Sequence, residues 1–468
     1  MSDRLRFHGL VLVALATGIA VSLAAPLVPM IAREEGVALA TAQWALTGSF
    51  LVAGVMAPLL GRLGVGRRLR PTLIVTLGLG VLGALLAALP LGIWGILAGR
   101  ALQGFPYAVA PLLFAVARNV LPEDRIAGGL STLSVANVAA AGLGFPLVSF
   151  VAMVAGLEGA LWFGFALMVV ALVVGVVVVP PSAVIAPGGL DLVGALLLGG
   201  GTFAVLLAVS RGGLWGYASP RTLVVAGVGV LLVLMALRWF GRVAAPLIDF
   251  RLARLPVVLG AHLTAVLAGI GMYVLLTCVL VIAQSPPGEG YGLGRSVAVA
   301  GLMLTPYSAL SVVGNRIALR AGHRVGPERL IPIGCLLYTT ALLSLWHWHA
   351  NPWQLVLAMS VGGIASGVTF NAIPWLVVRA VPNEETASVM SVNLVLRFVG
   401  FAMGSAVAVA FLSAFGGSAT SPSRLGFETA TLVGAGICLV ASLVAALLMS
   451  RPARSGEPTP GDGESLLR

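Results

Sequence analysis

Two arginines lie where the surrounding sequence is almost entirely apolar. Arg100 and Gln103 interrupt the run from Ile93 to Val116, within LAGRALQGFPYAVAP, and Arg397 interrupts a second apolar run. An ionisable side chain inside such a segment is costly and indicates a functional site by default. Arg100 could bind an anion or link proton movement to a conformational change. Alternatively, it could donate to helix carbonyls and to Gln103, and so brace its helix, the fourth apolar segment of the chain, against the first. The same two kinds of role, functional and structural, are open for Arg397.

Further polar side chains lie inside other apolar segments. His262 can gain or lose a proton near neutral pH, so it could replace a missing carboxylate, or it could simply hydrogen-bond the backbone near an interface. The other polar candidates for contact with a ligand or for coupling are Tyr107, Asn137, Asn371 and Asn393. Aromatic residues and methionines adapt to varied ligands, and those that could line an apolar cavity are Trp44, Phe105, Tyr107, Phe114, Met272, Tyr273, Met303, Tyr307 and Trp375.

No carboxylate lies clearly in the middle of an apolar segment, since all 16 fall in loops, tails or segment ends. This argues against a proton relay through a buried acid and against a strong preference for cationic ligands. His347 and His349 in WHWHA resemble a ligand pair but lack further ligands. With their tryptophan neighbours they are more typical of an interfacial aromatic belt. We expect no metal, no cofactor and, without a phosphate-binding loop, no direct use of a nucleotide.

The composition is that of a membrane protein. Hydrophobic residues make up 59% of the chain and charged residues 9%, with a mean hydropathy of +1.06, whereas a soluble chain has roughly 25% charged residues. The net charge of +11 comes from 27 arginines that lie mostly in short loops. This distribution excludes nucleic-acid binding. The three cysteines all lie in apolar segments and are expected to be free core residues.

Cutting the chain at charged, glycine and proline clusters predicts fourteen membrane-spanning helices. Their ranges are 9–32, 42–61, 72–90, 94–118, 127–155, 160–180, 190–210, 221–241, 256–284, 296–319, 328–349, 353–379, 388–415 and 427–450. Positive residues stay on the cytoplasmic side of a membrane. With the N-terminus inside, twenty arginines fall on the cytoplasmic side and five outside, while two lie within helices. Both termini are therefore expected in the cytoplasm.

An internal repeat divides the chain into two related halves. ARNVLPEDRIAGGLS (117–131) resembles VRAVPNEETASVMS (378–391), and the pairs Gly144/Gly404 and Asn137/Arg397 are both 260 positions apart. The predicted fold is an all-α integral membrane protein, with fourteen helices as 6+2+6 in two pseudo-symmetric six-helix bundles. We expect an N-terminal bundle (1–185), a two-helix insertion with a cytoplasmic linker (186–250), a C-terminal bundle (251–450) and a disordered cytoplasmic tail (451–468). Parallel repeats of this kind are typical of secondary transporters, whose substrate site lies between the repeats.

Several motifs together resemble the major facilitator superfamily, and within it the fourteen-helix drug:proton antiporter branch. GRLGVGRRLR (61–70) and NRIALRAGHR (315–324) are similar to the family's arginine-rich loop and its second copy, AGRALQG (98–104) to its helix-4 motif, and GLGFP (142–146) to the helix-5 motif of exporters. GGLWGYASP (212–220), APLIDFRLAR (245–254) and GYGLGRSVAVAGLMLTP (290–306) are similar to segments of the fourteen-helix branch. The resemblance extends from about residue 17 to about residue 450.

The resemblance implies a secondary active exporter of amphipathic small molecules or drugs, which works by alternating access in the bacterial cytoplasmic membrane with protons as the coupling ion. It implies gating or conformational roles for Gly61, Arg62, Gly66, Arg67, Arg68, Gly104, Gly142, Gly144, Pro146, Arg316, Gly322 and Arg324. This chain departs from the family pattern because helix 1 has no acidic residue, and Val65 and Leu319 stand where the two loops normally carry Asp.

Two alternatives remain open on the sequence. One is a transporter of the same fold that imports its substrate, or that moves lipids or anions. The other is a membrane-embedded enzyme such as an acyltransferase, which would need His, Asp, Ser or metal ligands converging at one interface. The acids are too scattered for such a site, so no catalytic residue is expected.

Overall fold

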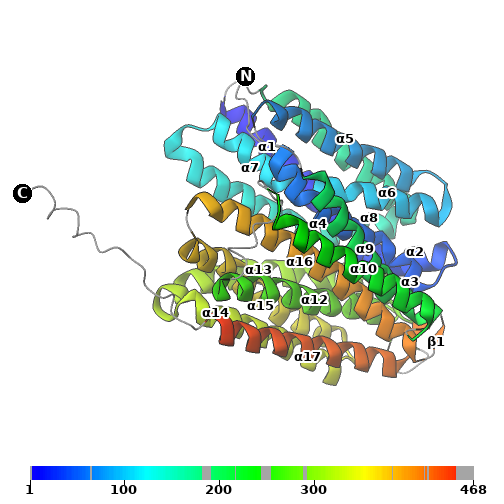
Figure 1. Cartoon of the computed structure of the whole chain (residues 1–468). Helices are drawn as coiled ribbons and strands as arrows, with labels where there is room; N and C mark the ends of the chain where they lie inside the picture. The colour runs from blue at the N-terminus through cyan, green and yellow to red at the C-terminus, as the bar shows by residue number, and fades with distance from the viewer. Residues whose placement is uncertain are drawn as a thin grey trace, which may run out of the picture.

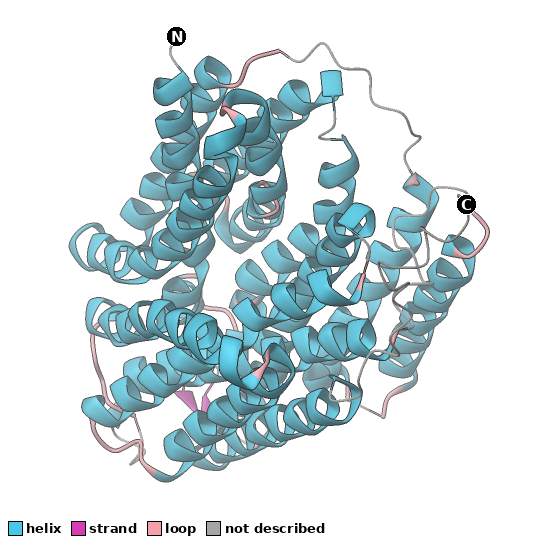
Figure 2. Ribbon diagram, turned by 90° about the vertical axis from the view of Figure 1, so that its left-hand side faces the viewer, coloured by secondary structure: helices cyan, strands magenta, loops and turns pink. Residues whose placement is uncertain are grey.

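The computed structural model describes residues 3–63, 66–181, 191–216, 218–243, 255–287, 292–381, 383–415, 417–418 and 421–449. These ranges are almost entirely helical, apart from an antiparallel pairing of β1 (Gly417–Ser418) with β2 (Ser421–Pro422), magenta in Figure 2. The helices are α1 (Asp3–Ser22), α2 (Ala24–Glu34), α3 (Leu39–Ala42), α4 (Trp44–Leu63), the 3-10 helix η1 (Gly66–Arg68), α5 (Leu69–Ala88), α6 (Gly92–Tyr107), α7 (Ala110–Val120), α8 (Glu123–Val178), α9 (Leu192–Trp215), α10 (Pro220–Phe240), α12 (Pro256–Gln284), α13 (Val297–Val325), α14 (Pro327–His347), α15 (Pro352–Ala380), α16 (Asn383–Ala414) and α17 (Arg424–Met449). Within the described ranges, eleven segments are long and apolar enough to cross a membrane.

Prolines account for breaks in two of the predicted spans. Pro26 has no N–H to donate to the carbonyl of Ser22, and α1 ends at that residue before α2 begins. Pro111 likewise cannot donate to the carbonyl of Tyr107, where α6 ends before α7. The ranges 9–32 and 94–118 are therefore each two helices in sequence.

A glycine replaces a loop within α8. Gly156 has φ 71° and ψ −172°, a combination essentially restricted to glycine. Both ends of α8 lie beside the start of α1, since Gly129 packs near Phe7 and Val178 packs against Gly9. The chain therefore turns back at Gly156, and the predicted spans 127–155 and 160–180 form one helical hairpin.

Two segments expected as loops are largely helical. NRIALRAGHR (315–324) lies inside α13, which continues to Val325. In GRLGVGRRLR, α4 continues to Leu63, η1 follows at Gly66 and α5 begins at Leu69, while residues 64–65 lie outside the described ranges. Arginine is a good helix former, so charge alone does not end a helix here.

The helices form two groups that meet along one long join. In Figure 1, the first group (blue to cyan) lies above the second (yellow-green to red), with α9 and α10 (green) across the join. α4 packs against α16, and the first part of α8 packs against α13. α9 contacts α10, α16 and α4.

Buried apolar side chains connect the two groups extensively at one end, whereas at the other end each group has its own core and only a small cluster around Leu59 and Val392 joins them through α9 and α10. The largest cluster, here called the shared core, combines residues of both groups, such as Leu27, Phe50 and Leu280. At the opposite end of the helices, an N-terminal core around Leu10 draws almost entirely on the first group. Among the described residues, the C-terminal core around Ile331 contains side chains of the second group alone.

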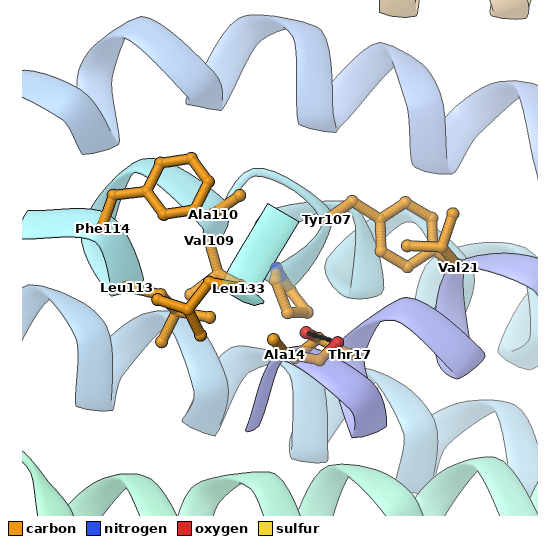
Figure 3. A pocket seen from close by; sticks show the side chains of 10 residues that line it. Ala14, Thr17, Val21, Tyr107, Val109, Ala110, Leu113, Phe114 and Leu133 are labelled. Carbon is orange, nitrogen blue, oxygen red and sulfur yellow. Dashed lines mark hydrogen bonds between the residues drawn. The ribbon is translucent and has the colours of Figure 1, made fainter. Parts of the chain in front are cut away.

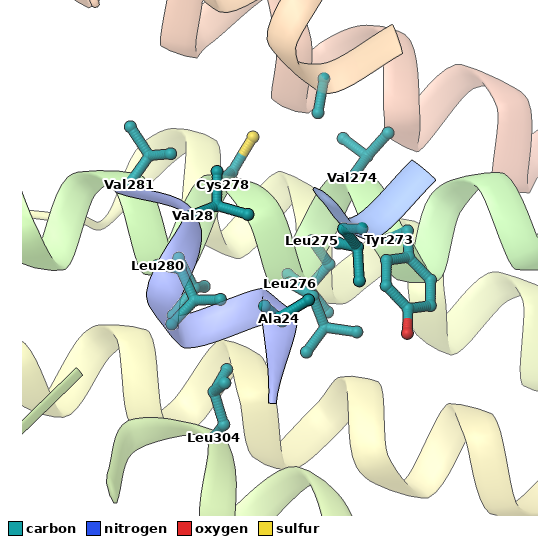
Figure 4. Packing of buried hydrophobic residues seen from close by; sticks show 14 of the residues in the cluster. Ala24, Val28, Tyr273, Val274, Leu275, Leu276, Cys278, Leu280, Val281 and Leu304 are labelled. Carbon is teal, nitrogen blue, oxygen red and sulfur yellow. The ribbon is translucent and has the colours of Figure 1, made fainter. Parts of the chain in front are cut away.

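The second half of α12 fills the middle of the shared core. All its residues from Tyr273 to Gln284 are buried, and Figure 4 shows several of them, such as Cys278 and Leu280, near Ala24 and Val28 of α2 and Leu304 of α13. Hydrogen bonds also cross the join at this end. The hydroxyl oxygens of Thr47 and Ser405 are 2.6 Å apart, and the amide of Gln284 donates to the Pro26 carbonyl at 3.5 Å.

Asp191 holds α9 and α10 together. Its Oδ1 accepts from the backbone N–H of Gly194 and from Nε1 of Trp239, both at 2.8 Å. The sequence correctly places this acid at a helix end, where it caps α9, but its side chain is only 7% exposed. The expected domain boundaries at 185–186 and 250–251, the motif APLIDFRLAR and the tail 451–468 lie outside the described residues.

Candidate functional site

A group of aromatic rings occupies the centre of the join. Phe50 is fully buried, and its ring centroid lies 4.8 Å from that of Tyr273, 5.7 Å from that of Phe401 and 6.2 Å from those of Tyr107 and Phe398. The aromatic cluster consists of Phe50 (α4), Tyr107 (α6), Tyr273 (α12), Phe370 (α15), Phe398 and Phe401 (α16). Such ring pairs contribute about 0.5–1.5 kcal/mol each beyond their area burial. The cluster therefore fastens the two groups at mid-helix.

Arg100 donates to three acceptors in the first group. Its Nη1 bonds Gln103 Oε1 at 2.5 Å, its Nη2 bonds the Tyr107 hydroxyl at 2.5 Å, and its Nε bonds the Ala45 carbonyl of α4 at 3.3 Å. The Tyr107 hydroxyl donates in turn to the Ala20 carbonyl of α1 at 3.0 Å. The guanidinium thus links three of the predicted spans.

The surroundings of Arg100 match the bracing alternative, with one change. The sequence suggested that Arg100 would brace helix 4 against helix 1, whereas its direct interhelical bond is to helix 2 and Tyr107 makes the contact with helix 1. The side chain is 1% exposed. In this conformation, its three nitrogens are all used by neighbouring protein groups.

Arg397 lies in a different environment. Its guanidinium carbon is 5.3 Å from the centroid of the Phe370 ring. Within the part of the chain that the structure describes, its Nε is buried without a hydrogen-bond partner. Close by in the second group, the hydroxyls of Tyr307 and Tyr338 are 2.8 Å apart. Arg397 is half-buried and keeps some accessible surface.

His262 and Asn393 lie together between α12 and α16. The Asn393 amide donates to the Ala261 carbonyl at 3.0 Å and lies 3.4 Å from Nδ1 of His262. The histidine is 5% exposed. Asn371 is exposed and donates to the Gly367 carbonyl of its own helix at 2.9 Å, so the structure does not bring it to His262. The Asn137 side chain lies outside the described residues.

A small pocket adjoins the break between α6 and α7. Its walls come from α1, from the residues around this break and from Leu133 of α8. Figure 3 shows Tyr107 and Phe114 at its two ends, with Ala14 and Thr17 of α1 between them. Tyr107 therefore belongs both to the pocket and to the aromatic cluster. Tyr107 and Phe114 were both expected to line an apolar cavity.

The predicted gating glycines are sites of close helix packing. A Cβ built on Gly104 would clash with the Ser49 carbonyl of α4, and one on Gly142 with Ser308 of α13 across the join. A Cβ on Gly144 would lie 2.7 Å from Cβ of Ser22 in α1. Small residues permit such approaches in membranes. Pro146 lies inside α8, where it removes one backbone hydrogen bond.

The arginine-rich motifs lie far from the aromatic cluster along their helices. Gly61 and Arg62 are in the last turn of α4, although the Arg62 side chain is not described, and Gly66 begins η1. The exposed members are Arg67, Arg68, Arg316 and Arg324, and Gly322 is buried in α13. Their gating role stays a prediction.

Sequence reasoning missed two parts of the site and one helix cap outside it. Phe50 was overlooked because a phenylalanine inside an apolar run carries no distinguishing signal. The bond between Thr47 and Ser405 joins residues 358 positions apart, which no local pattern reveals. Asp191 could have been recognised as a cap from its place just before an apolar run. The three cysteines are buried and free, which confirms that prediction.

The chain is similar in sequence and in fold to known membrane transporters. The family model described as Major Facilitator Superfamily matches residues 10–285 and 261–467. The lincomycin resistance protein LmrB of Bacillus subtilis is 23% identical over 388 residues, which cover 82% of this chain and 80% of that protein. The tetracenomycin C resistance and export protein of Streptomyces glaucescens is 25% identical over 399 residues, 81% of this chain and 70% of that protein. A crystal structure of a mutant of the nucleoside transporter NupG superposes with a TM-score of 0.66 at 15% identity, covering 96% of this chain and all of the other.

Proposed function

Because this chain belongs to the major facilitator superfamily, and is thus a multi-pass membrane transporter rather than an enzyme, we propose that it exports amphipathic small molecules from the bacterial cytoplasm. In this proposal, transport proceeds by alternating access and is driven by proton antiport. The direction is supported by relatives named for resistance and export at 23–25% identity. The protein would then bind the transported molecule and protons, and the lipid bilayer would surround its helices.

The observation that carries alternating access is the distribution of buried apolar side chains. The shared core joins the two groups at the end that contains Leu27 and Leu280, whereas the cores around Leu10 and Ile331 are separate at the opposite end, where only the small cluster around Leu59 and Val392 joins the groups. The arginine-rich segments lie at this separate end, so the positive-inside rule places it in the cytoplasm. We infer an inward-facing conformation, closed outside by α12 and the aromatic cluster.

Fourteen spans as 6+2+6 remain our reading of the helices. Counting α1 with α2, α3 with α4 and α6 with α7, and dividing α8 at Gly156, makes six spans before α9 and six after α10. The close packing of Gly144 on α1 corresponds to that of Gly404, whose built Cβ would lie 2.4 Å from the Ile270 carbonyl of α12. This equivalence supports two pseudo-symmetric bundles, 1–185 and 251–450, with residues 186–250 as the insertion and both termini in the cytoplasm.

The proton carrier is proposed to be His262. No carboxylate lies in the middle of a predicted span, and His262 is a buried titratable group beside Asn393, near the inner end of the join. Movement of α12 against α16 in a transport cycle would change its hydration, and hydration controls which protonation state is favoured. The alternative role for His262 is a structural hydrogen bond between these helices. His262→Asn separates the two roles, because asparagine can form a hydrogen bond but cannot carry a proton.

Transport in membrane vesicles tests the proposal. Inside-out vesicles with an acidic lumen are expected to accumulate an amphipathic fluorescent substrate, and to release it when a protonophore collapses the gradient. His262→Asn should lower the response to the gradient while substrate binding persists. Gly48→Ala is the matched control, since a Cβ built there meets nothing within 4 Å. Accumulation in right-side-out vesicles would instead identify an importer, and accumulation insensitive to the gradient would exclude proton antiport.

A further inference from the structure

The two arginines inside the apolar helices differ in which groups receive their hydrogen bonds. Arg100 is 1% exposed, and its guanidinium donates to Gln103, Tyr107 and Ala45. Arg397 has no hydrogen bond or ion pair within the described part of the chain, and its Nε is buried. A charge in an apolar environment is stable only if other groups compensate it. No donor of Arg397 is therefore engaged by a described residue, whereas three of the five N–H groups of Arg100 are already used.

The rings beside Arg397 provide a place for a flat apolar group. The guanidinium lies over Phe370, which meets Phe401 edge to face at 6.1 Å. Phe401 in turn contacts Tyr273 at 4.8 Å. Ring pairs prefer offset or edge-to-face contact, so an aromatic ligand can replace one of these protein contacts with an equivalent one. Aromatic rings and a cation are thus adjacent on α15 and α16.

Hydroxyl groups supply further polar contacts near the same guanidinium. Tyr307 and Tyr338 share one hydrogen bond of 2.8 Å. Two hydroxyls joined in this way have one remaining O–H, for which the neighbouring Ser366 and an incoming acceptor compete. A carboxylate accepts from both a guanidinium and a hydroxyl and takes the guanidinium in a bidentate pair. No acid of the described spans lies near Arg397 to compete for it.

We propose that Arg397 and the aromatic cluster form the recognition site for the transported molecule, and that this molecule is a planar aromatic acid. The inference rests on the proposed export function and adds the substrate class. The carboxylate or phenolate of the ligand would pair with Arg397, while its ring would lie against Phe370 and Phe401. Aromatic cations would be excluded because no carboxylate of the described residues is available at this position to receive them.

Binding to the purified full-length protein in detergent tests this inference separately from transport. The probes are 2-naphthoate, 2-naphthamide and 2-naphthylmethylammonium, which share one ring system and differ in charge, and titration calorimetry gives each Kd. We expect the carboxylate to bind at least about tenfold more tightly than the amide, as is usual for a hydrogen bond to a charged group. Equal binding of all three probes, tighter binding of the ammonium, or no binding of 2-naphthoate would each overturn the proposal.

Variants assign the preference to Arg397. Arg397→Gln should remove the preference for the carboxylate and leave amide binding within about twofold of the wild type, because the rings remain. Arg397→Lys should keep part of the preference. Arg424→Gln is the control, since Arg424 is exposed on α17 and pairs with its helix neighbour Glu428. A preference that survives in Arg397→Gln would overturn the assignment.

The wild-type series decides the substrate class even if Arg397→Gln fails to fold, which size-exclusion chromatography would show. Transport of 2-naphthoate in vesicles then separates the two proposals. Selective binding without transport would contradict export while leaving the recognition site intact. Transport of the neutral or cationic probe alone would support export and refute the substrate class.

Discussion

Replacing Arg100 tests whether it braces the helices or takes part in transport chemistry. The guanidinium makes three hydrogen bonds, of which the one to Ala45 crosses between helices. A side-chain hydrogen bond in a membrane protein averages about 0.6 kcal/mol and reaches about 1.7 kcal/mol. Arg100→Met, which keeps much of the side-chain volume, should therefore lower the free energy of unfolding by about 2–5 kcal/mol.

A double-mutant cycle of Arg100→Met with Tyr107→Phe measures how much of this free energy comes from the hydrogen bond between the two side chains. The Tyr107 hydroxyl accepts from Arg100 and donates to the Ala20 carbonyl, so its removal should cost about 1–3 kcal/mol by the same reasoning. The two losses share one hydrogen bond. The double variant should therefore be less destabilised than the sum of the single variants, by about 0.6–1.7 kcal/mol.

Equilibrium unfolding in mixed micelles measures these free energies. The cysteines at 278, 335 and 438 are buried and free, so reaction with a thiol-specific dye reports exposure of the interior. Arg424→Met is the matched control: this arginine is 65% exposed and ion-paired with Glu428, and its loss should change stability by less than about 1 kcal/mol. Additive single effects, or a fully stable Arg100→Met that no longer transports, would refute the bracing role.

Two further predictions concern the packing and the closed outer end. Gly404→Ala should reduce stability and transport, because its Cβ would lie 2.4 Å from a carbonyl oxygen of α12. Gly48→Ala should leave both unchanged, since a Cβ built there meets nothing within 4 Å. If the two variants changed unfolding and efflux to the same extent, the packing role of Gly404 would be contradicted. Thr47→Val removes the 2.6 Å bond to Ser405 across the join and should favour the outward-open state. Labelling of the buried Cys278 by a membrane-impermeant thiol reagent should then become faster than in the wild type; an unchanged rate would contradict the outer-gate role.

The positions of the helices could be predicted largely from the apolar segments. The range 256–284 coincides with α12, because proline starts this helix and a polar, proline-containing segment follows it. Helix breaks inside apolar segments were missed, although Pro26 and Pro111 contain the needed signal. The predicted spans 127–155 and 160–180 place a turn between them, but that Gly156 alone makes this turn could not be foreseen, since a chain with 60 glycines does not mark which one adopts a positive φ.

The charged residues of the candidate site could be identified from the sequence, but the residues that contact them could not. The hydrogen bond between Arg100 and Gln103 follows from their spacing on one helix face. The different environments of Arg100 and Arg397 do not, because they depend on Tyr107 in one case and Phe370 in the other. Such partners are ordinary apolar or aromatic residues until the fold places them beside a charge.

The two equivalent connections, the turn at Gly156 and the β1–β2 pairing, differ in whether they can accept an inserted sequence. At Gly156, one residue turns the chain between two membrane-spanning helices, and its backbone conformation excludes other residues. An antibody epitope or an electron-microscopy fiducial inserted there would distort both helices at once. The equivalent connection in the second half contains the β1–β2 pairing from Gly417 to Pro422. A graft at this hairpin would mark the face that we propose to be the outer one while leaving α16 and α17 in place.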